Sequence, residues 1–152
     1  MRDPTWSQPL RLERMGHLSL RVSDLDASEE FYAKVLGMNP VWRNEGEIAF
    51  LECGNDDLAL IQIPKEEVHV FRQRAKGSQS LHHFGFRVRT TGEVDRAAQE
   101  VMGRGIVIDD GPRDHRDGSR SFYFKDPDGN YIQILWDPVR ETPPSEGTHN
   151  IT

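Results

Sequence analysis

The chain has almost no cysteine and no long apolar run. Its single cysteine, Cys53, cannot form a disulfide within the chain and has no second thiolate for a metal site. We expect Cys53 to be a small buried core residue in a protein of a reducing compartment. No apolar run approaches the roughly 20 residues that cross a bilayer, and the first residues lack the apolar stretch of a signal peptide. These absences argue against a disulfide scaffold and a membrane protein, and they predict a cytoplasmic location.

A surplus of positive charge is also missing. The formal net charge of the 152 residues is −6, and the Lys and Arg residues are scattered among acids. Binding to a phosphate backbone needs a basic patch or stripe, so we do not expect nucleic acid as a partner.

The sequence does contain one succession of elements twice. Residues 17–22 alternate as a strand, and a helical stripe and three short strand-like runs follow them. Asp26 and Glu29 are predicted to form a capping box, and Gly37 is predicted to end the helix. The same order recurs from residue 83 onward, with "IVI", "SRSFYFK" and "YIQILW" as the last three strands. The sequence therefore predicts an α+β protein of two βαβββ modules.

A repeat of this length also predicts the organisation of the chain. Neither copy can bury its apolar face alone, so the copies must pair, within one chain or between chains. The predicted parts are an N-terminal arm (1–14), a first module (15–64), a partly helical linker (65–80), a second module (81–138) and a polar tail (139–152).

Two adjacent histidines open the second module. In a strand, His83 shares a face with Gly85 and Arg87, whereas His82 shares the opposite, apolar face. His83 is also the residue that matches His17 of the first module. We therefore expect His17 and His83 to meet in a site, with His82 in a supporting role.

Side-chain oxygens on the last strands could complete a ligand set. Aligning the modules puts Gln62 and Gln133 on the final strands, which gives two imidazoles and two amide oxygens. Such a set suits iron(II), manganese, zinc or nickel, with positions left open for a substrate. The alternative is structural: strand histidines are often only hydrogen-bonded, and Gln133 could bond to His17 or His83 in a pocket without metal.

Together these features resemble the vicinal oxygen chelate superfamily. The resemblance rests on the repeat, on "GHLSLRVSDLDASEEFYAKVLGM", on the histidine that opens the second copy and on "FYFKDPDGNYIQI". The superfamily includes glyoxalase I, type I extradiol dioxygenases and the fosfomycin and bleomycin resistance proteins. The resemblance implies that paired modules curl into an incomplete mixed-sheet barrel around a divalent metal, which chelates adjacent substrate oxygens.

The second half most resembles the extradiol dioxygenases, where two histidines and a glutamate hold iron(II). By this resemblance, His17 and His83 match the histidines, His115 matches an acid–base histidine and Tyr123 a substrate-orienting tyrosine. Gln133 stands where the family places glutamate. A neutral amide binds a cation less strongly than a carboxylate does and cannot act as a base, which disfavours glyoxalase chemistry. The alternatives for His115 and Tyr123 are a solvated loop residue and a packing aromatic.

Three functions remain open from the sequence. The first is a metal-dependent enzyme of dioxygenase type acting on a small aromatic diol, with iron(II) as the leading metal. The second is a metal-independent protein that binds a small molecule or drug, and a glyoxalase-like lyase or isomerase comes third. In each case a homodimer is expected. Trp42 and Trp136 are expected in the core or on a cavity wall.

Overall fold

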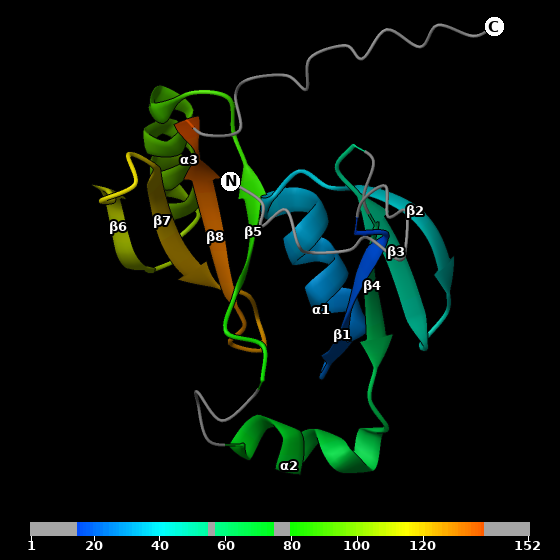
Figure 1. The fold of residues 1–152 in the computed structure, drawn as a ribbon. Coiled ribbons are helices and arrows are strands. Elements are labelled where there is room, and N and C mark those ends of the chain that lie inside the picture. Colours follow the sequence, from blue (N-terminus) through cyan, green and yellow to red (C-terminus); the bar gives the residue numbers. More distant parts are fainter. Residues whose placement is uncertain (1–14, 55–56, 75–79, 139–152) are drawn as a thin grey trace, which may run out of the picture. The chain divides into compact units, whose positions relative to one another are not determined.

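The computed structural model describes residues 15–54, 57–74 and 80–138. The chain divides into two units, Met1–Val68 and His69–Thr152, and each contains one four-stranded mixed sheet (Figure 1). The predicted arm and tail lie outside the described residues.

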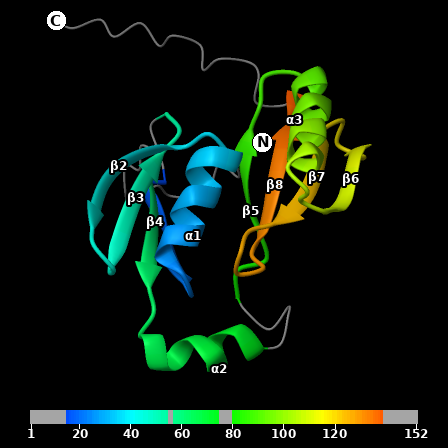
Figure 2. The same cartoon turned by 180° about the vertical axis from the view of Figure 1, so that it is seen from behind.

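The first unit is a βαβββ module in which the last strand lies beside the first. Strand β4 runs parallel to β1, while β3 is antiparallel to both β4 and β2, so the strand order is β1-β4-β3-β2. Helix α1 packs on β3 and β4 (Figure 2). The elements are β1 (His17–Val22), α1 (Leu25–Glu30), the π-helical turn η1 (Phe31–Val35), β2 (Asn39–Asn44), β3 (Ile48–Glu52) and β4 (Asp57–Gln62).

The second unit repeats this topology with the order β5-β8-β7-β6, and β8 runs parallel to β5. Helix α3 packs on β6, β7 and β8. Its elements are β5 (Phe84–Arg87), α3 (Thr91–Gly103), β6 (Ile108–Asp114), β7 (Arg120–Lys125) and β8 (Tyr131–Trp136). The link contains η2 (Lys65–Glu67) and α2 (Val68–Gln73), which confirms its helical content.

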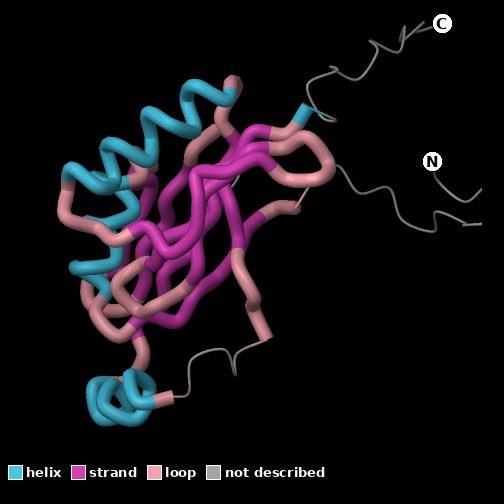
Figure 3. Tube along the Cα trace, turned by 90° about the vertical axis from the view of Figure 1, so that its left-hand side faces the viewer, coloured by secondary structure: helices cyan, strands magenta, loops and turns pink. Residues whose placement is uncertain are grey.

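Both modules therefore confirm the predicted α+β class. In each module more residues lie in strands than in helices, and Figure 3 shows the strands in magenta. Neither four-stranded sheet closes into a barrel by itself, because each keeps two edge strands.

Side-chain alternation sorts the strand residues as expected. On β1, Leu20 and Val22 are buried, whereas His17, Ser19 and Arg21 are exposed. The helix stripe of the second module behaves in the same way, with these residues buried: Val94, Ala98 and Val101. The helix side of each sheet is thus the core, and the other side is left for polar groups.

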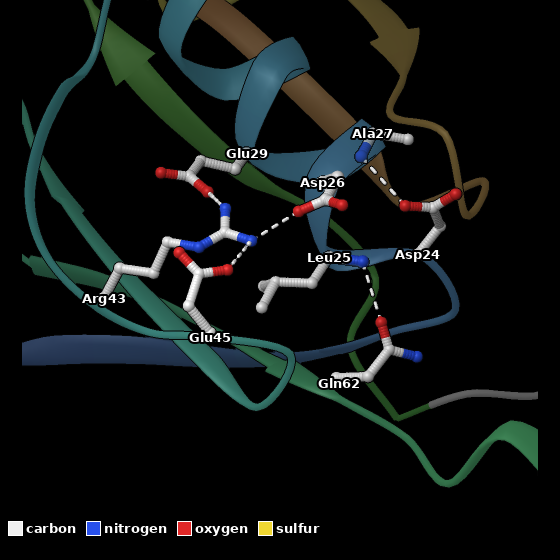
Figure 4. Close-up of polar contacts among 8 residues, drawn as sticks. All are labelled: Asp24, Leu25, Asp26, Ala27, Glu29, Arg43, Glu45 and Gln62. Carbon is white, nitrogen blue, oxygen red and sulfur yellow. Dashed lines mark hydrogen bonds and ion pairs between the residues drawn. The ribbon is translucent and has the colours of Figure 1, made fainter.

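The predicted capping box of the first helix is wrong. Asp24 is the N-cap, and its Oδ1 accepts a hydrogen bond from Ala27 N at 3.0 Å. Asp26 and Glu29 instead pair with Arg43 of β2, as does Glu45 at 3.2 Å (Figure 4). The side chains of all three acids can reach one guanidinium, which removes Asp26 and Glu29 from capping. The three carboxylates raise the pKa of Arg43.

Two further expectations fail. The strand predicted at "IVI" begins only at Ile108 and continues through polar residues to Asp114. Strand β6 is an edge strand that pairs with β7 alone, so polar side chains there remain in solvent and apolar alternation does not mark the element. Cys53, expected in the core, is exposed in the bend that follows β3.

We predict that Asp24→Ala lowers the free energy of unfolding by about 1 kcal/mol, the usual cost of losing an N-cap. Asp26→Ala should lower it less, because Arg43 keeps two other carboxylate partners. Urea unfolding of both variants measures the difference. Equal losses, or a larger loss for Asp26→Ala, would contradict the assignment of Asp24 as the cap.

Candidate functional site

One row of residues crosses the second sheet. Gln133 on β8 lies opposite Gly85 on β5 and opposite Tyr123 on β7. Its chain neighbours Ile132 and Ile134 are buried. Because successive side chains of a strand point to opposite faces, Gln133 and Tyr123 lie on the side away from the core. We call this side the open face of the second sheet.

The two histidines before β5 contact each other, and His83 also contacts Tyr123. The His83 ring contacts the Tyr123 ring edge to face, with centroids 5.2 Å apart. The Nδ1 atoms of His82 and His83 are 2.7 Å apart, so one of them is protonated and donates a hydrogen bond to the other. When His83 is the donor, its Nε2 carries a lone pair, which is the form that a metal ligand needs. His82 is thus in the right place for the supporting role predicted for it.

A buried serine joins Gln133 to His115. Gln133 Nε2 donates to Ser121 Oγ at 3.0 Å, and the same Oγ lies 2.6 Å from His115 Nε2. His115 follows β6, and its backbone N–H donates to Ser119 O, which closes the turn into β7. That turn brings the imidazole to the open face. We call these three side chains the serine-centred chain.

The two candidate ligands of this unit share one arrangement. In each, one polar atom is held by a neighbour: Nδ1 of His83 by His82, and Nε2 of Gln133 by Ser121. The other polar atom, Nε2 of His83 or Oε1 of Gln133, has no hydrogen-bond partner among the described residues. Ligands fixed from behind with a donor atom available in front are typical of metal sites. This donor set fits a divalent cation, although it brings no negative charge.

Two carboxylates interact electrostatically with His115. Arg113 donates hydrogen bonds to Asp110, and these lower the pKa of Asp110. Ser119 donates through its hydroxyl and its backbone N–H to Asp117, and this lowers the pKa of Asp117. Both carboxylates are therefore charged at neutral pH and already hydrogen-bonded, Asp110 within β6 and Asp117 in the turn before β7.

Gln62 lies in a different setting from Gln133. Its Oε1 accepts from Leu25 N at 2.8 Å, and its Nε2 donates to the carbonyls of Ser23 and Ile63 at 3.0 and 2.9 Å. Figure 4 shows the amide against the first turn of α1. In β4 it lies two residues after the buried Leu60 and four after the buried Leu58, so it shares their face, the helix side of the sheet. These bonds fasten the turn between β1 and α1 to the end of β4.

Strand register also shows that the two glutamines are not equivalent. Ser19 lies opposite Ala59, and Gly85, its counterpart in the repeat, lies opposite Gln133. The position of the first module that corresponds to Gln133 is therefore Ala59, which has no donor atom. Both glutamines do fall on final strands, as expected, but they face opposite sides of their sheets.

The predicted ligand set divides between the two units. His17 is exposed on β1 of the first unit, whereas His83 and Gln133 belong to the second. The described residues contain no group of three or more His, Cys, Asp or Glu side chains placed to hold a metal ion.

Ser121 was missing from the expectations drawn from the sequence. The signal was present in "SFYFK", where Ser121 and Tyr123 alternate with the buried Phe122 and Phe124. Alternation alone puts this serine on the face of Tyr123, although its two hydrogen bonds require the register of β7 and β8 and the turn after β6.

Comparison with known proteins identifies the family. The model of the Glyoxalase/Bleomycin resistance protein/Dioxygenase superfamily matches residues 14–134. The chain belongs to this superfamily, as the sequence motifs predicted. No helix in the described parts of the chain is long and apolar enough to cross a membrane.

Similar proteins within the superfamily differ in activity and length. The virulence protein STM3117 of Salmonella typhimurium is 29% identical, over 81% of this chain and 83% of its own. The catechol-2,3-dioxygenase of Bacillus subtilis is 27% identical over 84% of this chain, which spans only 43% of that enzyme. The crystal structure of a lactoylglutathione lyase from Agrobacterium tumefaciens matches with a TM-score of 0.67 and 26% identity, over 84% and 95% of the two chains.

We predict that Gln62→Leu lowers the free energy of unfolding by about 2 kcal/mol, because it leaves the N–H of Leu25 and two carbonyls without their partner. Divalent-metal affinity should not change. Gln99→Leu, at an exposed position of α3, is the matched control for stability. Loss of metal binding without loss of stability would instead make Gln62 a ligand.

We predict that Gly85→Ala disturbs the open face. A Cβ atom at Gly85 would lie 2.9 Å from Gln133 O and 3.1 Å from Gln133 Cβ, so β5 and β8 must move apart. The expected cost is about 1–3 kcal/mol of unfolding free energy. Gly103→Ala meets no atom within 4 Å and is the control. Equal thermal stability of the two variants would rule out this close approach.

Proposed function

We propose that the protein is a divalent-metal-dependent enzyme of dioxygenase type that acts on a small aromatic diol or a similar molecule with adjacent oxygens. The proposed ligands are His17, His83 and Gln133, and iron(II) is the first metal to test. Gln62 has no part in the proposed set, because its amide is hydrogen-bonded on the helix side of its sheet.

The observation that carries the proposal is the shared arrangement of His83 and Gln133. Each is fixed by a neighbour, and each has a donor atom with no partner in the described chain. A purely structural amide or imidazole would be expected to use both of its polar atoms, as Gln62 does. His83 directly precedes β5, and Gln133 lies on β8, the strand that pairs with β5.

Two further residues of this face have defined tasks. His115 is held at Nε2 by Ser121, so its outward nitrogen, Nδ1, is the atom that would exchange a proton with a substrate oxygen. Tyr123 packs edge to face on His83 at the open face, where its hydroxyl would orient the substrate. A divalent cation, when bound, would polarise the substrate oxygens and favour their ionised form.

The amide at position 133 favours dioxygenase chemistry over glyoxalase chemistry. An amide cannot accept a proton from a substrate carbon, so a lyase or isomerase that relies on a basic ligand lacks its base here. The ligand that a dioxygenase needs can be neutral, at a cost in metal affinity. The similarity to the catechol-2,3-dioxygenase supports this choice. Because the chain is also similar to a lactoylglutathione lyase, glyoxalase activity should be assayed alongside.

A specific observation favours a second candidate, a metal-independent binding protein. On the first sheet, Trp42 and Phe50 lie opposite each other on β2 and β3, with ring centroids 5.6 Å apart. Phe50 lies between the buried Ala49 and Leu51, so it points away from the core, and Trp42 is 54% exposed. This aromatic pair could stack against a flat ligand without any metal.

We predict that the protein, purified without oxygen and loaded with iron(II), manganese, zinc or nickel, binds about one ion per chain. His83→Ala and His17→Ala should remove the ion. Gln133→Glu should tighten binding by tenfold or more, because a carboxylate adds charge attraction worth roughly 1.4 kcal/mol or more. Isothermal titration and metal analysis measure these effects, and oxygen uptake with catechols then tests the reaction.

The control variant is His69→Ala, which removes an exposed histidine from α2. Its metal content should equal that of the wild type. If no ion binds under any loading condition and aromatic compounds quench the tryptophan fluorescence, the metalloenzyme proposal is rejected and the binding-protein proposal is supported.

A further inference from the structure

The serine-centred chain has a direction, which follows from counting hydrogens. A serine hydroxyl has one proton to donate and two lone pairs that accept. Ser121 is 1% exposed, and Oγ has two partners among the described residues, Gln133 Nε2 and His115 Nε2. With no third acceptor, the single proton of Ser121 must go to one of these two groups.

Gln133 cannot take that proton in the observed orientation. Its Nε2 is a donor only, so it occupies one lone pair of Ser121 Oγ. The hydroxyl proton of Ser121 then points at His115 Nε2, 2.6 Å away. An imidazole nitrogen that accepts a hydrogen bond is unprotonated, so neutral His115 carries its proton on Nδ1.

We propose that Gln133, acting through Ser121, fixes His115 as a hydrogen-bond donor at Nδ1 toward the substrate. Ser121 is the positioning residue of this device. Its catalytic meaning rests on the proposed function: the substrate class is one with an anionic oxygen, such as an ionised diol, for which an N–H donor is the complementary group. The direction of the chain itself does not depend on any metal.

The surroundings of His115 leave Nδ1 available for this task. Nδ1 has no hydrogen-bond partner within the described ranges, and the nearby carboxylates of Asp110 and Asp117 are bonded to Arg113 and Ser119. His115 is half-buried, so one side of the ring is held by Ser121 while the other is accessible.

The residue type at position 133 decides the direction of the chain. A carboxylate has no proton to give, so Glu at this position would accept the proton of Ser121. Ser121 Oγ would then accept from His115, which would need its proton on Nε2 and would offer a lone pair at Nδ1. Gln133→Glu should therefore convert His115 from a donor into an acceptor toward the substrate.

The test is nitrogen-15 NMR of the histidine rings in the full-length, metal-free protein at about pH 8, where neutral imidazole dominates. His115→Gln assigns the His115 signals. The wild type should show the Nδ1–H tautomer, although neutral histidine in water favours Nε2–H. Gln133→Glu should shift the tautomer ratio toward Nε2–H by about tenfold, the effect of roughly one net hydrogen bond.

Two variants separate this effect from a general disturbance. Gln99→Glu makes the same chemical change on the exposed surface of α3 and should leave the ratio as in the wild type. Ser121→Ala removes the connection and should return His115 toward the ratio of free histidine. If Gln133→Glu fails to fold, the wild type and Ser121→Ala still decide the question.

An Nε2–H tautomer in the wild type, or a ratio insensitive to both Ser121→Ala and Gln133→Glu, overturns the inference. These outcomes differ from a failure of the proposed function. Absence of metal binding would leave an Nδ1–H tautomer intact, and a metal-binding protein could still show Nε2–H at His115.

Discussion

The parallel pairing of the first and last strand in each module decides which residues can share a face. Because β4 lies beside β1 and β8 beside β5, residues about 40 to 50 positions apart in the sequence lie in one row. In the second module this row joins Gly85, Gln133 and Tyr123. The absence of a side chain at Gly85 leaves room for Gln133, since a Cβ atom there would lie 2.9 Å from its carbonyl oxygen. The open face depends on this one close approach.

The same topology gives the two glutamines opposite tasks. Gln62 comes at the end of β4, where the chain from β1 turns into α1, so its amide meets three backbone groups. Gln133 comes in the middle of β8, where only side chains are within reach, so it bonds to Ser121 and keeps its oxygen toward the open face. A repeat in sequence therefore does not make these residues equivalent. Their distance from the end of the strand decides what the amide can bind.

Patterns of short period predicted most of the fold, and part of the site. Alternation placed His17 away from the core, and the helical stripe of α3 was correct. Features that depend on reach between elements were not predictable. Asp24 caps α1 while Asp26, inside the first turn, pairs with Arg43 of β2. Ser121 acquires its role only when β7, β8 and the turn after β6 meet. The bounds of edge strand β6 were not predicted, because its polar residues show no apolar alternation.

If the proposed function holds, the neutral donor set couples the binding of the metal to the binding of the substrate. Two imidazoles and an amide leave the full charge of a divalent cation uncompensated, and the nearby carboxylates of Asp110 and Asp117 are already hydrogen-bonded to Arg113 and Ser119. An ionised diol would supply the missing negative charge, and an N–H at His115 would add a donor to the same oxygens. Metal and substrate should therefore stabilise each other on this face. A glutamate at position 133 would weaken that coupling twice, by neutralising the cation and by reversing the hydrogen bonds that reach His115.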